Sequence, residues 1–280
     1  MRRALVTGAA GMLGSEVVRA LRRDWEVLEA DLADFDITDE DTTAEAVHRT
    51  SPEVIVNCAA YTDVDGAESH PETAHAVNGA GAGSLSRAAR SVGAFILHVS
   101  TDYVFDGTKE GPYTEDDEPD PIGVYGESKL RGEREVLASG AQSLIVRTAW
   151  LYGHGGANFV ETVLRLSESG EPLRIVDDQR GSPTNARDLA LVLRDLAGGG
   201  ARGLLNATNA GSASWYDFAV EILRASGRAD APVEPVSTAE FPRPAPRPRS
   251  SVLSLDRLSE VLGWTPRPWE EALAEYLSER

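Results

Sequence analysis

A tyrosine and a lysine lie four residues apart in the segment VYGESKL, residues 124–130 of this 280-residue chain. Residues four apart share one face of a helix, so Tyr125 and Lys129 would be neighbours if this segment is helical. A nearby ammonium group lowers the pKa of a phenol, which lets the phenol transfer a proton near neutral pH. Such pairs also arise by chance, and the rest of the sequence has to decide between the two interpretations.

A glycine-rich segment near the N-terminus, ALVTGAAGMLGSEVV, has the pattern of a dinucleotide site. Gly8 permits a tight turn after a strand, Gly11 lets backbone amides approach a pyrophosphate, and Gly14 lets the following helix pack close to the strand. The start of that helix, which includes Met12 and Leu13, would supply N–H donors and a positive dipole to the phosphates. The spacing is GxxGxxG, and we predict that it binds NADH or NADPH.

Further residues of this cofactor site are expected at the ends of the next strands. Asp31 ends the second expected strand and can accept hydrogen bonds from the adenosine ribose hydroxyls, which favours NADH over the 2′-phosphate of NADPH. Asp36 and Ile37 are placed to cap an adenine ring, although Asp36 fits the N-cap of a helix equally well. Ala59 and Ala60 follow the third expected strand, where small side chains let the cofactor pass over the sheet.

The elements that must position these residues alternate between strand and helix. Short apolar runs predict strands at 4–7, 26–30, 54–58, 95–100 and 143–148, with helical patterns near 12–23, 40–50, 71–92 and 126–139. This alternation predicts a parallel sheet with helices on both faces, and strands that are apolar throughout fit burial on both faces. We therefore predict an α/β protein with a Rossmann doubly wound parallel sheet at 1–148, to which later segments can return.

The second half of the chain is less regular and predicts a smaller C-terminal α/β substrate-binding domain at 149–280. Helical patterns lie near 157–169, 186–197, 214–226 and 268–279, with short strand-like runs at 173–176 and 204–207. The proline-rich tract FPRPAPRPRSS at 241–251 cannot be helical. It fits either a surface linker or a loop that faces the ligand.

Composition limits the partners that this chain can have. The 45 acidic and 27 basic residues give a formal charge of −18, which argues against nucleic acid and against an anionic membrane surface. The single cysteine, Cys58, excludes an intramolecular disulfide and a cysteine metal cluster. No run of 18 apolar residues and no signal-peptide pattern occurs, so we expect a cytoplasmic protein without a membrane span.

The fourth expected strand brings a hydroxyl group to the predicted cofactor. Thr101 stands at the carboxyl end of that strand, at the same edge of the sheet as the glycine loop. Tyr125 and Lys129 open the next helix, whose N-terminus faces this edge as well. A hydroxyl, a phenol and an ammonium group thus converge beside a predicted nicotinamide, which favours the catalytic interpretation of the tyrosine–lysine pair.

This constellation resembles the extended short-chain dehydrogenase/reductase superfamily over nearly the whole chain. Within it, the segments STDYVFDG, YGESKL, VRTAWLYG and DDQRGSPT and the Arg-Pro tract before SSVLS are similar to the dTDP-4-dehydrorhamnose reductase family. The resemblance implies hydride transfer from NADH or NADPH to C4 of a dTDP-4-keto-6-deoxyhexose. It implies that Tyr125 donates the proton, that Thr101 hydrogen-bonds the same carbonyl oxygen, and that Lys129 holds the nicotinamide ribose and lowers the Tyr125 pKa.

The resemblance also implies a binding site for the dTDP-sugar. The residues that match it are Thr62, Val64, Asp102, Tyr103, Trp150, Asn158, Arg180 and Arg247. Trp150 fits a core position as well, and Asn158 fits an ordinary helix N-cap. Exposed arginines are usually only solvated, so Arg180 and Arg247 are open to the same alternative.

Two departures separate this chain from relatives of the superfamily. Sugar-nucleotide dehydratases have Thr-Asp-Glu where this chain has Tyr103 after Asp102, and a phenol is a poor base for elimination, which favours simple reduction. Some family members hold magnesium with carboxylates at a dimer interface. Glu16 matches one contributor, but Arg187 stands where a later glutamate is expected. We therefore predict no metal, and a homodimer stays open.

Two alternatives to this function remain at the level of sequence. A sister reductase of another deoxysugar, such as a dihydrostreptose synthase, is not excluded by the motifs. A non-catalytic dinucleotide-binding protein is the other, because the regulatory subunit of methionine adenosyltransferase resembles this fold. The intact Thr101, Tyr125 and Lys129 favour an enzyme, since a binding module does not need the phenol.

Overall fold

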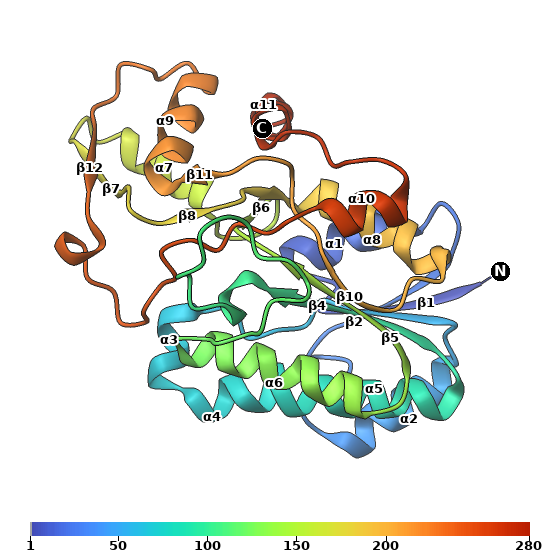
Figure 1. Cartoon of the computed structure of the whole chain (residues 1–280). Coiled ribbons are helices and arrows are strands. Elements are labelled where there is room, and N and C mark those ends of the chain that lie inside the picture. The colour runs from blue at the N-terminus through green and yellow to red at the C-terminus, as the bar shows by residue number, and fades with distance from the viewer. Residues whose placement is uncertain (1) are drawn as a thin grey trace.

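The computed structural model describes residues 2–280 and has a six-stranded parallel sheet at its centre (Figure 1). The strands are β1 (Arg3–Thr7), β2 (Glu26–Ala30), β3 (Val54–Asn57), β4 (Phe95–Thr101), β5 (Gln142–Thr148) and β10 (Gly203–Asn206). Their spatial order is β10-β5-β4-β3-β1-β2, and all neighbours are parallel. The order reverses between β1 and β3, and parallel sheets bind ligands over the carboxyl ends of the strands at such a point. The predicted doubly wound α/β class is confirmed.

Helices cover both faces of this sheet (Figure 1). One face packs against α1 (Met12–Leu21), α8 (Ala186–Gly199) and α10 (Asp256–Leu262), and the other against α2 (Glu40–Thr50), α5 (Ala82–Val92) and α6 (Val124–Ala138). Successive strand residues point to opposite faces, so Val54 and Val56 contact the first layer while Ile55 contacts the second. Burial on both faces explains why the strands are apolar throughout.

The helix expected at 71–92 is interrupted. It consists of α4 (Pro71–Ala74), a π-helical segment η1 (His75–Gly81) and α5, and it follows the short helix α3 (Val64–Ser69). Within η1, the Asn78 side chain accepts from the Tyr61 N–H at 2.8 Å and donates to the Tyr61 carbonyl oxygen at 3.0 Å. It also donates to the Ser128 hydroxyl at 3.0 Å. The interruption thus joins the loop after β3 to α6, and π-helical turns are frequent at functional sites.

A second lobe has a separate core. Its helices are α7 (Phe159–Ser167), α9 (Trp215–Ala225) and α11 (Trp269–Ser278), and buried Tyr152, Phe218 and Leu273 lie between them. Three two-stranded sheets complete it: β6 (Leu151–Tyr152) with β9 (Thr184–Asn185), β7 (Leu173–Val176) with β12 (Val233–Val236), and β8 (Arg180–Gly181) with β11 (Ala213–Ser214). Although α8 and β10 come from the second half of the chain, they belong to the central sheet layer (Figure 1). The domain boundary after residue 148 stays a prediction.

The proline-rich tract, which we call the strap (residues 241–251), is fixed at both ends. Asp65 in α3 accepts hydrogen bonds from Arg243, from the Ala245 N–H at 3.2 Å and from Arg247 Nη1 at 2.6 Å. At the other end, the Ser251 hydroxyl donates to the carboxylate of Asp102. Partial burial raises the pKa of Asp65, but the hydrogen bonds from Arg247 and Arg243 outweigh it and hold that pKa at about 2. The strap is therefore a structural connection between the lobes.

Within residues 2–280, we find no helix that combines the length and the apolar character needed to cross a membrane.

Close backbone packing around the glycine loop gives the first testable prediction. A Cβ at Gly14 would lie 2.0 Å from the Gly8 carbonyl oxygen, so alanine there must push α1 away from the β1 turn. We expect Gly14→Ala to lower the free energy of unfolding by about 1–3 kcal/mol. We also expect it to weaken NADH binding about tenfold or more, which corresponds to about 1.4 kcal/mol. Thermal melting and a fluorescence titration with NADH measure the two effects.

The matched control is Gly198→Ala, in helix α8, where an added Cβ meets no atom within 4 Å. Alanine favours the helix over glycine by about 1 kcal/mol, so this variant should be at least as stable as the wild type and bind NADH equally well. Normal NADH binding by Gly14→Ala would show that the close packing of α1 is not required.

Candidate active site

A cleft of about 830 Å³ opens over the carboxyl ends of β1, β3 and β4, where the order of the strands reverses. This volume is at the upper end of the range for small-molecule sites. Most of the predicted site residues line it: Gly8, Gly11, Met12, Leu13, Asp31, Asp36, Ile37, Ala59, Ala60, Thr62, Val64, Thr101, Asp102, Tyr103, Tyr125, Lys129 and Trp150. Asn158, Arg180 and Arg247 do not line it.

The glycine loop has the geometry that a dinucleotide requires. Gly8 adopts a φ of +66°, and a Cβ there would lie 2.8 Å from the Ala59 backbone nitrogen. Helix α1 begins after Gly11, which has no side chain to cap it, so the first N–H groups of the helix point into the cleft without a side-chain partner. A helix start of this kind binds phosphate through its N–H groups and its dipole. The residues present therefore fit a dinucleotide cofactor.

The residues around the expected adenosine end have more than one role. The Asp31 carboxylate lines the cleft and accepts a hydrogen bond from the Ala10 N–H at 2.6 Å, so it also holds the glycine loop. Asp36 accepts from the N–H and hydroxyl of Thr38 at 2.9 and 2.8 Å. The alternative that Asp36 caps the following helix is wrong, because Asp39 is the N-cap of α2.

Thr101, Tyr125 and Lys129 come together at one end of the cleft. Thr101 is the last residue of β4, and Tyr125 and Lys129 lie in the first turns of α6. The Thr101 hydroxyl donates to Asp102 Oδ1 at 3.0 Å and accepts from the Tyr103 N–H at 3.2 Å. Lys129 Nζ donates to the Val99 carbonyl oxygen at 2.7 Å. A proton donor, a hydroxyl and a cation thus line the same wall.

Burial controls the pKa values of these groups. It raises the pKa of Tyr125 to about 12, the nearby Thr101 hydroxyl opposes this, and the charge of Asp102 adds to it. Burial also lowers the pKa of Lys129 to about 8, against the charge of Glu133. The expected lowering of the Tyr125 pKa by Lys129 is therefore not seen, because the ammonium group is directed at Val99. A raised pKa keeps the phenol protonated, which suits a proton donor.

Asp102, which follows Thr101, is buried, and Tyr103 after it is partly buried. The Asp102 carboxylate accepts from the Thr101 and Ser251 hydroxyls, and burial raises its pKa to about 6 against these hydrogen bonds. The Tyr103 ring meets the Tyr125 ring edge to face, with centroids 5.6 Å apart. Burial and the charge of Asp102 raise the Tyr103 pKa, so Tyr103 stays a neutral phenol. A neutral phenol cannot serve as the base that an elimination needs.

Trp150 belongs both to the cleft and to the second lobe. Its backbone has a φ of +45°, which is unusual for a bulky residue and occurs mostly at functional sites. The Trp150 ring stacks on Trp215 with centroids 3.5 Å apart and an angle of 6°. It also lies against Gly181, where a Cβ would come within 2.3 Å of the ring. Trp215 was missed by the sequence analysis, since its partner is distant in the chain.

The three predicted residues outside the cleft have partners of their own. Asn158 is the N-cap of α7: its side chain accepts from the Glu161 N–H at 3.1 Å and donates to the Gly153 carbonyl oxygen at 2.9 Å. Gly155, Gly156 and Ala157, just before it, line the cleft in its place. These residues belong to the glycine-rich sequence GHGGA, and glycine allows the backbone to approach a ligand closely.

The two arginines are held by carboxylates. Arg180 forms a 3.6 Å ion pair with Asp217, and both side chains are half exposed. Arg247 is bound to Asp65, and its side chain is 15% exposed. Their contact with a diphosphate group stays a prediction.

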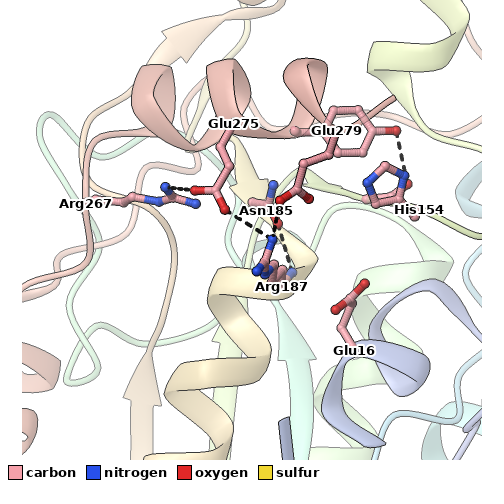
Figure 2. Close-up of a pocket in the computed structure, with 9 residues that line it drawn as sticks. Glu16, His154, Asn185, Arg187, Arg267, Glu275 and Glu279 are labelled. Carbon is pink, nitrogen blue, oxygen red and sulfur yellow. Dashed lines mark hydrogen bonds and ion pairs between the residues drawn. The ribbon is translucent and has the colours of Figure 1, made fainter. Parts of the chain in front are cut away.

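The residues where some relatives hold magnesium do not fit a metal in this chain. Figure 2 shows Arg187 among the acidic side chains of Glu16 on α1 and of Glu275 and Glu279 at the end of α11. Its Nη1 lies 3.1 Å from Glu275 and 2.7 Å from Glu279, while Glu16 pairs with Arg19 at 3.3 Å. Across residues 2–280, no group of three or more His, Cys, Asp or Glu side chains is arranged to hold a metal ion. The guanidinium group of Arg187 thus occupies the place of a metal ion. That the protein functions without a metal stays a prediction.

A dinucleotide cradle at the reversal of a parallel sheet, with Thr101, Tyr125 and Lys129 beside it, defines an extended short-chain dehydrogenase/reductase fold and site. The family model for the RmlD substrate binding domain matches residues 1–280, and the chain belongs to this family.

Known relatives agree with this assignment over their full length. A dTDP-4-dehydrorhamnose reductase of Mycobacterium tuberculosis is 46% identical over 99% of this chain and 92% of its own. The crystal structure of a dTDP-4-dehydrorhamnose reductase from Clostridium acetobutylicum superposes with a TM-score of 0.95 at 43% identity, covering 99% of both chains. A Bacillus anthracis dTDP-4-dehydrorhamnose reductase in complex with NADP gives a TM-score of 0.94 at 37% identity over all of both chains.

Because Arg187 lies among these acidic side chains, we predict that the wild type does not respond to metal ions. We expect neither added magnesium nor a chelator to change the melting temperature or the activity of the wild type. Arg187→Glu would place a fourth carboxylate beside Glu16, Glu275 and Glu279. Magnesium should then stabilise the variant, by about 1.4 kcal/mol when its free concentration is about ten times Kd. Thermal melting with and without magnesium measures this effect.

Arg165→Glu is the control, because it makes the same charge change at an exposed site on α7. Its melting temperature should not respond to magnesium. A chelator that lowers the stability or the activity of the wild type would contradict the prediction.

Proposed function

We propose that this protein reduces the C4 keto group of a dTDP-4-dehydro-6-deoxyhexose with NADH or NADPH, most of all dTDP-4-dehydro-L-rhamnose to dTDP-L-rhamnose. The observation that carries the proposal is the convergence of Thr101, Tyr125 and Lys129 beside a glycine cradle for a dinucleotide. The reductases from Mycobacterium tuberculosis and Clostridium acetobutylicum support the same activity. They support it over a non-catalytic dinucleotide-binding subunit.

The reaction uses each of the three residues differently. Bound NADH or NADPH supplies the hydride that goes to the C4 carbon of the sugar. Tyr125 gives its phenolic proton to the carbonyl oxygen as negative charge develops there, and Thr101 stabilises that oxygen with a hydrogen bond. Lys129 supplies the positive charge among the described residues that line the cleft. It holds the nicotinamide ribose.

The cleft favours reduction over a dehydration. A dehydratase needs a base beside the reacting sugar, and Tyr103 is a partly buried, neutral phenol there. The second lobe completes the proposed sugar site with Trp150, whose ring is held by Trp215 and Gly181. Thr62 and Val64 line the same cleft. We propose a cytoplasmic location for this reaction, and a homodimer stays a prediction.

Replacement of the proton donor tests the proposal directly. We expect Tyr125→Phe to lower kcat by about 10²- to 10⁴-fold, the range for removal of a proton-transfer group, with little change in cofactor affinity. The assay follows nicotinamide absorbance with dTDP-4-keto-L-rhamnose generated in situ.

The matched control is Tyr216→Phe, in helix α9, because Tyr216 does not line the cleft. It should retain wild-type kcat. If the wild type oxidises neither cofactor with this sugar but binds NADH tightly, the proposed substrate is wrong.

The cofactor preference gives a separate prediction. The residues that line the cleft include the carboxylate of Asp31 but no arginine to pair with a 2′-phosphate, so we expect NADH to be preferred. Asp31→Asn combined with Leu32→Arg should shift the ratio of kcat/KM for NADPH over NADH upward by about tenfold, equivalent to about 1.4 kcal/mol. Leu32 is 74% exposed beside the cleft, so an arginine there can reach the phosphate.

Asp24→Asn removes an exposed carboxylate away from the cleft and serves as the charge control. Its cofactor ratio should equal that of the wild type. An unchanged ratio in the double variant would show that Asp31 does not set the preference.

A further inference from the structure

Three side chains follow one another at four-residue intervals along α6: Tyr125, Lys129 and Glu133. Residues four apart share one face of a helix, so Glu133 lies one turn beyond Lys129 on the same stripe. Tyr125 and Lys129 line the cleft, whereas Glu133 lies behind it and is 2% exposed. The reduction described above makes no use of this buried carboxylate.

Glu133 is held by both neighbouring strands. Its Oε1 accepts from the Ser100 hydroxyl at 2.5 Å and from Arg147 Nε at 2.9 Å, and its Oε2 accepts from Arg147 Nη2 at 2.7 Å. Ser100 in β4 and Arg147 in β5 are register partners. The side chains of Glu133 and Arg147 are each 3% exposed. A bidentate pair buried in this way has a fixed geometry, and it fixes the end of β4 at Thr101.

The ionisable groups around Lys129 leave Glu133 as its counter-charge. They are Tyr125 and Glu133 on α6, Cys58 after β3, His98 on β4 and Arg147 on β5, while Asp102 acts on Tyr125. Burial raises the pKa of Cys58 to about 12 and lowers that of His98 well below its usual value, so both are neutral. Lys129 itself is 3% exposed and has one protein hydrogen-bond acceptor, the Val99 carbonyl oxygen. A buried ammonium group needs a nearby anion to stay charged.

We propose that Glu133, held by Arg147 and Ser100, is a positioning residue that keeps Lys129 protonated and in place for the cofactor. The proposal rests on the proposed reduction, in which Lys129 holds the nicotinamide ribose. Arg147 fixes the Glu133 carboxylate through two hydrogen bonds, and its own positive charge competes with that of Lys129 for this carboxylate. The strength of the counter-charge at Lys129 is therefore set by the balance between a carboxylate and a guanidinium group that both lie outside the cleft.

This balance predicts an order of pH dependence for three variants. NADH affinity should fall as pH rises and Lys129 loses its proton, with a midpoint near the pKa of about 8 in the wild type. Glu133→Gln removes the counter-charge and leaves Arg147, so its midpoint should be the lowest. Arg147→Gln removes the competing cation and should raise the midpoint above the wild type. Glu133→Gln/Arg147→Gln should lie between Glu133→Gln and the wild type, and each single change should be about one pH unit.

The measurement is a fluorescence titration with NADH at a series of pH values, which needs no sugar substrate. Circular dichroism checks the fold of each variant, because a single change leaves a buried charge without its partner. The double variant leaves neither Glu133 nor Arg147 without its partner, so we expect it to fold more reliably than either single variant. A midpoint below that of the wild type in this variant is a test of the proposal by itself. Asp188→Asn is the control: it breaks a 2.7 Å pair with Arg267 outside the cleft and should leave the midpoint unchanged.

The outcomes separate this proposal from the proposed function. The role of Glu133 would be overturned if the wild type and the double variant had equal midpoints. It would also be overturned if the midpoint fell in both single variants, because a pair with only a structural role would not move the midpoint in opposite directions. The expected order of midpoints without any turnover of the dTDP-sugar would overturn the proposed substrate and leave the role of Glu133 standing. In the enzyme assay, the alkaline limb of kcat/KM should move in the same order as the binding midpoints.

Discussion

Three backbone segments meet at one point of the sheet, and the rest of the site depends on that contact. The turn after β1, the start of α1 and the loop after β3 approach one another so closely that a Cβ at Gly8 or Gly14 would overlap backbone atoms. Because the order of strands reverses between β1 and β3, this contact lies where a parallel sheet opens to a ligand. The close packing places the uncapped start of α1 over that opening. Phosphate binding thus depends both on this steric constraint and on the topology of the sheet.

Burial is the second constraint, and it acts in opposite directions on the groups of the cleft. It raises the pKa of Tyr125 to about 12 and lowers that of Lys129 to about 8. Both shifts have one cause, because a low dielectric disfavours the charged form of either group. The phenol therefore keeps the proton that a reduction consumes, while the ammonium group depends on a counter-charge. That need explains why a buried carboxylate, Glu133, follows Lys129 on the same stripe of α6.

The parts of the site that could be predicted from sequence are those fixed by local rules. The spacing of Gly8, Gly11 and Gly14 and the four-residue interval from Tyr125 to Lys129 each depend on a single turn or helix. Alternation of apolar runs and helical patterns was enough for the doubly wound class, because strands buried on both faces have a recognisable composition. Residue pairs distant in the chain were not predictable. The stacking of Trp150 on Trp215 is one such case.

Competition between partners explains the remaining differences from the sequence-based expectations. Asn158 was expected at the ligand or at a helix N-cap, and the free N–H of Glu161 decides for the cap. Asp65 holds Arg247 together with Arg243, and the contact of Arg247 with a diphosphate stays a prediction. The strap looked like a linker because proline excludes a helix, and nothing local shows that a carboxylate in α3 fixes it. In each case the residue type could be used for a prediction from sequence, whereas its interaction partner could not be predicted.

The chain is strongly acidic, and the cleft must therefore bind an anionic cofactor with few cationic side chains. The chain has a formal charge of −18, and the arginines near the site are held by carboxylates: Arg247 by Asp65, Arg180 by Asp217 and Arg147 by Glu133. No arginine is among the described residues that line the cleft. Backbone N–H groups at the start of α1 must therefore carry most of the phosphate binding. A binding site made from backbone depends on the fold and not on side-chain charge, so an acidic protein can keep it.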